Sequence, residues 1–236
     1  MWRRLVCVMC LIPCLVAAEE KLAEDPTRVE TKLGLSYDDA FNLSASFAFD
    51  AARKINASIN KDASEWRLGG SWLFPVGIVN FSFGRNEFTS GAHQTHYSVG
   101  TFIPLSYFGF KPFGIEIFPA AGYSHNNGEI ICRGNTQSSS FCHGLSNNLD
   151  IGLVTLPVKS NGGYLGMFAL KPITPALTLI LAAGSAKGSN HYSGHAFGAG
   201  LGLRINERQS CHFLAYSTDN SYGSESHLGL SYKYTF

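Results

Sequence analysis

The segment HLGLSYKYTF, residues 227–236, decides the fold class. Large apolar side chains occupy every second position, and His, Gly, Ser, Lys and Thr fill the positions between them. Because successive residues of a strand point to opposite faces, the segment predicts a strand with one apolar and one polar face. Similar alternation, clearest near the two ends, predicts further strands along the chain. Strands are expected at 29–37, 41–50, 54–60, 65–74, 77–86, 95–105, 112–124, 163–171, 176–185, 196–205, 210–218 and 227–236.

Two architectures contain many alternating strands, a soluble sandwich and a membrane barrel. In a sandwich the second face meets bulk water and usually carries many Lys and Glu, whereas here it is mostly Ser, Asn, Gly and Ala. Charged residues make up only 15% of the chain, against about a quarter in soluble domains. The segment lengths also match tilted strands that cross a bilayer. The sequence therefore predicts an all-β protein, a closed antiparallel transmembrane β-barrel.

The number of strands must be even in a bacterial barrel of this kind. Twelve segments are clear, and one weaker stretch at 149–157 would make a thirteenth, which cannot close. We therefore predict twelve strands, with ten or fourteen still possible, and assign 126–162 to one long extracellular excursion. Shorter outer loops are expected at 86–94, 186–193 and 218–225.

The first residues are typical of a signal peptide. Two arginines precede an apolar run at 5–16, and small residues lead up to a cleavage position after Ala18. This pattern predicts a signal peptide at 1–18, a periplasmic N-terminal segment at 19–28 and an outer-membrane barrel domain at 29–236.

Export places the remaining cysteines in an oxidising compartment, where a pair that is close in sequence tends to bond. Cys132 and Cys142 flank the polar segment RGNTQSSSF, which is typical of a stapled surface loop. We expect a disulfide between them. Cys211 is then left as a single thiol.

The ending YKYTF at 232–236 resembles the C-terminal strand of Gram-negative outer-membrane proteins, which alternates apolar residues and closes on an aromatic one. The resemblance covers about the last ten residues and identifies no subfamily. It implies that the chain lies in the cell outer membrane, in contact with its lipid. It also implies that Tyr232, Tyr234 and Phe236 form the signal read by the barrel assembly machinery.

The strand positions that face the lumen carry charges of both signs, because a charge that faced lipid at mid-depth would cost about 2–4 kcal/mol. We expect the lumen to be lined by Glu30, Lys32, Asp50, Lys54, Arg67, Glu116, Arg204 and Lys233. These residues could line a hydrated, weakly selective channel, or they could form a salt-bridge network that fills a narrow barrel. Barrel diameter grows with strand number, and twelve strands lie between filled barrels and open porins, which favours a narrow pore for small hydrophilic solutes.

Other classes of function have less support. His96 with Ser98, and His191 with Ser193, lie two apart as a nucleophile and base on one strand face would. An outer-membrane lipid hydrolase is therefore an alternative, although no third group that orients the base can be identified. A structural or adhesive barrel that acts through its extracellular loops is another. The net charge of +1 gives no reason to expect nucleic acid, and the scattered histidines predict no metal site or cofactor.

Overall fold

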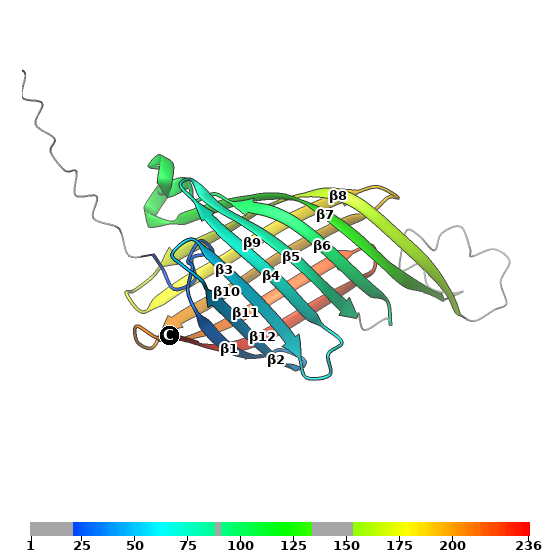
Figure 1. Cartoon of the computed structure of the whole chain (residues 1–236), viewed down its shortest axis with the longest axis horizontal. Helices are drawn as coiled ribbons and strands as arrows, with labels where there is room; N and C mark the ends of the chain where they lie inside the picture. Colours follow the sequence, from blue (N-terminus) through cyan, green and yellow to red (C-terminus); the bar gives the residue numbers. More distant parts are fainter. Residues whose placement is uncertain (1–20, 88–90, 134–152) are drawn as a thin grey trace, which may run out of the picture.

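The computed structural model describes residues 21–87, 91–133 and 153–236. Twelve strands form one closed antiparallel barrel in which sequence neighbours pair and β1 closes on β12 (Figure 1). The predicted fold class and strand number are confirmed. The strands are β1 (Lys32–Tyr37), β2 (Phe41–Ala48), β3 (Arg53–Asn60), β4 (Trp66–Phe74), β5 (Gly77–Glu87), β6 (His93–Phe102), β7 (Glu116–Arg133), β8 (Leu153–Pro172), β9 (Leu177–Gly188), β10 (Ser193–Arg204), β11 (Gln209–Asn220) and β12 (Gly223–Thr235).

Closure of the barrel depends on the strand that ends the chain. Leu35 of β1 lies opposite Tyr232 of β12, and the backbone N–H of Phe236 donates to Thr31 O beyond the last strand pair. The rings of Tyr234 and Phe236 meet edge to face, with centroids 5.0 Å apart. The expected assembly segment is thus also the seam of the barrel. Its recognition by the assembly machinery stays a prediction.

The outer surface of the barrel is apolar. Phe47, Trp72 and Leu230 are 54%, 60% and 59% exposed, and the residues that alternate with such side chains along each strand face the lumen. A soluble protein rarely leaves so continuous an apolar band open to water. The band is therefore the surface that contacts lipid. No helix in the described ranges is long and apolar enough to span a membrane.

The bounds of the long excursion predicted at 126–162 are wrong. β7 and β8 continue to pair into it from both ends, from Glu116 opposite Leu170 to Arg133 opposite Leu153, and residues 134–152 lie outside the described ranges. The stretch at 149–157 gives no thirteenth strand, because its described residues from 153 onward belong to β8. Figure 1 shows this strand pair extending past the other strands. The part of a strand that projects beyond the lipid needs no apolar face. The sequence therefore shows no alternation there, although the backbone pairing continues.

Two smaller corrections concern the connections. The loop predicted at 218–225 is reduced to Ser221 and Tyr222, because β11 and β12 pair up to Asn220 opposite Gly223. The strand predicted from 112 begins at Glu116, after two short 3₁₀ helices, η1 (Leu105–Phe108) and η2 (Pro112–Gly114). These helices lie at the same end of the barrel as the C-terminus (Figure 1).

Candidate functional site

The N-terminal segment, defined here as residues 21–31, folds into the end of the barrel that holds the C-terminus (Figure 1). The segment is compact, because Asp25 N–H donates to Leu22 O and Arg28 N–H donates to Asp25 O, both at 3.1 Å. Thr27 is only 1% exposed, and its hydroxyl donates to Asp25 at 2.7 Å. Residues 19–28 are the predicted periplasmic N-terminal segment. The part of it that the structure describes, from residue 21, lies inside the barrel mouth.

An apolar contact fixes one side of this segment. Leu22 packs against the small core made by Phe118, Leu170 and Ile180, which are 1%, 0% and 6% exposed. These three side chains point inward from β7, β8 and β9. Their strands thus provide the lumen with an apolar seat at this end.

The opposite side of the segment is held by charge. Lys32 pairs with Glu30 at 2.7 Å, and Arg28 pairs with the same carboxylate. The ammonium group of Lys54 donates to Arg28 O, and that of Lys32 contacts Ala23 O at 3.5 Å. Burial alone would raise the pKa of Glu30, but Lys32 and Arg28 outweigh it and hold that pKa below its usual value. The docked segment therefore favours an ionised Glu30.

Glu24 makes a buried polar contact. Its carboxylate lies 3.4 Å from His212 Nε2 of β11, and both side chains are less than 5% exposed. Gly202 of β10 faces this carboxylate directly, and any side chain at that position would occupy its space. Burial would raise the pKa of Glu24, yet contacts with His212 and Thr178 lower it below the usual value. A buried carboxylate with such partners is costly to neutralise, so it anchors the segment.

Five of the eight residues predicted to line the lumen lie inside the barrel. Lys32, Lys54 and Lys233 surround the N-terminal segment, and Lys233 interacts electrostatically with Lys32 and Glu24. Glu30 belongs to the segment itself. Arg67 lies on the inward face of β4, opposite Ser58, towards the other end of the barrel.

Three predicted residues lie at the margins of the barrel. Glu116 begins β7 and pairs with Lys111 at 2.6 Å. Arg204 ends β10, and its backbone N–H donates to Ala176 O. Asp50 does not line the lumen, because it lies in the β2–β3 turn and pairs with the exposed Arg53 at 2.6 Å. The strand pattern was extended two residues too far there.

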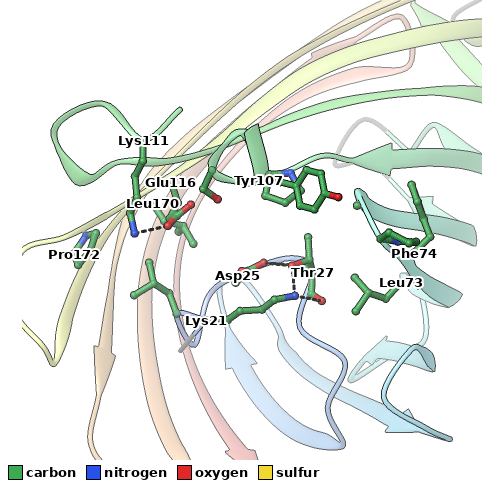
Figure 2. Close-up of a pocket in the computed structure, with 15 residues that line it drawn as sticks. Lys21, Asp25, Thr27, Leu73, Phe74, Tyr107, Lys111, Glu116, Leu170 and Pro172 are labelled. Carbon is green, nitrogen blue, oxygen red and sulfur yellow. Dashed lines mark hydrogen bonds and ion pairs between the residues drawn. The ribbon is translucent and has the colours of Figure 1, made fainter. Parts of the chain in front are cut away.

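The opening that remains at this mouth is a cavity of about 620 Å³ between the N-terminal segment and the wall (Figure 2). Lys21 and Asp25 face it from the segment, and the Lys111–Glu116 pair faces it from the wall. Apolar side chains line the rest, among them Leu73, Phe74, Tyr107, Leu170 and Pro172. The segment narrows the mouth and leaves an opening on one side with charges of both signs.

The middle of the lumen is roomy because small residues face inward. A cavity of about 260 Å³ adjoins Gly166, Gly184 and Ala196, and another of about 250 Å³ adjoins Ser44 and Tyr216. Interior walls of Gly, Ala and Ser leave space that larger side chains would fill. The lumen therefore holds volume that side chains leave unfilled.

Buried side chains gather inside the opposite end. Gln94 donates to Asn126, and Tyr222 OH donates to Val158 O at 3.1 Å. Tyr192 packs against Tyr222 with ring centroids 6.0 Å apart, and all five side chains are under 10% exposed. The short turns between β9 and β10 and between β11 and β12 provide the two tyrosines. This end is thus narrowed as well.

The His/Ser pairs do not face bilayer lipid together. His96 and Ser98 share the inward face of β6, since Tyr97 between them is 50% exposed on the lipid side. His191 lies in the β9–β10 turn with a φ of 58°, and the Ser193 N–H donates to Ser221 Oγ. A lipid substrate held in the bilayer cannot reach a pair inside the lumen.

Some sequence predictions fall outside this geometry. The predicted signal peptide lies outside the described residues. Cys142 also lies outside them, so the disulfide expected between Cys132 and Cys142 stays a prediction. Cys211 is a half-buried free thiol. No group of three or more His, Cys, Asp or Glu side chains among the described residues could hold a metal ion.

Sequence reasoning missed the role of the N-terminal segment. Glu24, Asp25, Thr27 and Arg28 have no strand period, so nothing in the pattern linked them to the lumen. His212 sits at an inward position of β11, but its buried environment depends on Glu24. The only available signal was the excess of inward lysines at this end, which requires compensating negative charge.

Comparison with known proteins supports the fold. No family model and no curated protein matches the chain. Among solved structures, the translocator domain of autotransporter NalP from Neisseria meningitidis aligns over 88% of this chain and 86% of its own, at 9% identity and a TM-score of 0.54. A channel from Pseudomonas putida F1, described as the COG4313 outer membrane channel, covers 92% of this chain and 100% of its own at 8% identity, with a TM-score of 0.48. The KdgM porin covers 88% and 99% at 10% identity, with a TM-score of 0.46.

At such identities the likeness concerns the fold alone. The matched proteins are outer-membrane β-barrels, and this chain has the same kind of closed antiparallel barrel with a lipid-facing apolar band. The expected location in the cell outer membrane agrees with both observations. The chain is an outer-membrane β-barrel protein.

Proposed function

We propose that this barrel is a narrow pore for small hydrophilic solutes, and that its N-terminal segment restricts the periplasmic mouth. The observation that carries the proposal is the unfilled lumen, whose cavities lie between two narrowed ends. A barrel built only for structure could fill that space with apolar side chains, as small barrels do. Here glycine, alanine and serine leave it open to water.

The charges favour weak selectivity. Around the N-terminal segment, the wall lysines Lys32, Lys54 and Lys233 are offset in part by Glu24 and Glu30. At the mouth cavity, Lys111 is balanced by Glu116. Since ion selectivity in pores follows the net sign of the lining, this small positive excess should give only a weak preference for anions.

Arg67→Glu tests whether the lumen is the path of the ions. Arg67 is exposed on the inward face of β4 and away from the N-terminal segment, so the reversal should leave the segment docked. We expect the ratio of cation to anion permeability, measured as a zero-current potential in a planar bilayer, to rise roughly two- to five-fold. Arg53→Glu is the matched control, because Arg53 is an exposed cation outside the lumen. An equal shift in both variants, or a shift in neither, would count against a lumenal path.

A second candidate rests on the extension of β7 and β8 beyond the other strands. A paired ribbon that projects from the membrane is a surface on which an adhesive or structural barrel could bind a partner. In that case the charges around Glu24 would serve stability alone. An electrically silent barrel would favour this candidate over the pore.

A further inference from the structure

A hollow lies on the lipid-facing side of the barrel, between β4 and β7. It has a volume of about 510 Å³ and is lined almost wholly by apolar atoms. Leu68, Phe81, Tyr97 and Tyr123 form its walls, each about half exposed. Its floor is Gly70, where an added Cβ would meet nothing closer than Lys54 O at 3.7 Å. One missing side chain on an otherwise bulky surface thus creates a groove that suits an acyl chain.

A row of aromatic rings crosses the barrel surface at the outer end of this groove. Trp66 meets Phe83 with centroids 4.9 Å apart, Phe83 stacks on Tyr97 at 4.6 Å, and Tyr97 reaches His125 at 6.0 Å. Aromatic rows of this kind mark the boundary between lipid and water. The row lies towards the end opposite the two termini, so the groove faces the outer leaflet.

The next outward-facing row, one step beyond the rings, is polar and carries positive charge. Strand register places Arg85 opposite Thr95, Thr95 opposite Asn127, and Asn127 opposite Lys159. Arg85 and Lys159 are both exposed. The acidic residues Glu87 and Glu129 lie one row farther out, on either side of His93. A headgroup above the groove therefore meets the cations first.

The spacing of the two cations specifies the ligand. Arg85 and Lys159 are three strand spacings apart, or roughly 14 Å at the usual distance between strands. The phosphate of a single glycerophospholipid contacts both only if the two side chains extend toward each other over Thr95 and Asn127. A disaccharide with a phosphate at each end has the necessary span, and its acyl chains would enter the bilayer beside the rings.

We propose that this face binds lipid A, the acylated disaccharide bisphosphate that anchors lipopolysaccharide in the outer leaflet. One acyl chain occupies the groove over Gly70, and the two phosphates lie against Arg85 and Lys159. His125, whose Nδ1 lies 2.5 Å from Asn161 Oδ1, is held at the sugar level between the two cations. The site is on the outside of the barrel and is independent of whether the lumen conducts.

The test measures lipid binding to the whole protein purified in detergent free of lipopolysaccharide, by native mass spectrometry. The probes are bisphosphorylated lipid A, monophosphorylated lipid A and a zwitterionic phospholipid. We expect the bisphosphorylated form to bind about ten-fold more tightly than the monophosphorylated form, and the phospholipid to bind most weakly. Arg85→Glu with Lys159→Glu should remove the difference between the two forms of lipid A.

Two phenylalanine variants test the groove itself. Gly70→Phe fills it and should weaken lipid A binding about ten-fold. Ala215→Phe is the control, because Ala215 is exposed on the outward face of β11, a strand that takes no part in the groove. Heat-dependent gel mobility verifies that each variant is a folded barrel. Equal binding of the two lipid A forms, or equal effects of the two phenylalanines, would overturn the proposal.

Discussion

Removal of residues 21–30 is expected to raise the single-channel conductance on the order of three-fold, since conductance increases with the open cross-section of a barrel. These residues fill much of the mouth beside a cavity of about 620 Å³. The strands keep their pairing without them, because β1 begins at Lys32 and bonds only to β2 and β12. The measurement is planar-bilayer recording of the truncated barrel beside the intact chain.

A substitution gives the same test without truncation. Glu24→Gln with Glu30→Gln removes the two carboxylates that meet His212, Lys32 and Arg28. We expect frequent openings to the larger conductance, because the segment loses its electrostatic anchors while Leu22 keeps its seat. Asp50→Asn is the control, since Asp50 carries a similar charge in an exposed turn of the same end. Unchanged conductance in both the truncated and the double variant would show that the segment does not restrict the path.

Acidification should open the same mouth reversibly. The pKa values of Glu24 and Glu30 lie below their usual 4.5 when the segment is docked. Their contribution to docking is therefore fully present above that usual value and is lost as the pH falls through the lowered values. We expect the small conductance to persist at about pH 5 and the larger one to dominate near pH 3.

The groups around the two carboxylates set the sign of this effect. Glu24 faces His212, Thr178 and Lys233, and Glu30 faces Arg28 and Lys32. Protonation of His212 adds a positive charge beside Glu24, so it favours docking as long as that carboxylate stays ionised. Opening that is complete between about pH 7 and pH 5.5, where both carboxylates are still ionised, would contradict the carboxylate mechanism. The double Gln variant should show no further opening at low pH.

Sequence alternation predicted the barrel because lipid imposes it. Every strand segment that crosses the bilayer needs an apolar outer face, so residues such as Leu228 and Leu230 repeat at period two. Beyond the lipid this requirement ends, and the polar stretch around Asn126 and Asn127 looked like a loop although its backbone pairs with β8. Hydrogen bonds between strands leave no mark in the sequence.

The site was predictable only in part. The inward parity of Lys32, Lys54 and Arg67 follows from the strand pattern, since a charge in lipid is costly. The pattern did not predict which of these cations would pair with a carboxylate, because the carboxylates belong to the N-terminal segment, which has no strand periodicity. The contact between Glu24 and His212 joins residues far apart in the chain. The groove at Gly70 depends on the register of four strands, which alternation alone does not specify.

Single-channel recording of the unmodified chain tests most directly whether the lumen conducts. At neutral pH we expect small discrete steps with little preference between cations and anions, and a transition to larger steps on acidification. A folded barrel that stays silent at neutral and acid pH, and also without residues 21–30, would show that the lumen is closed and that the charges around Glu24 serve only stability.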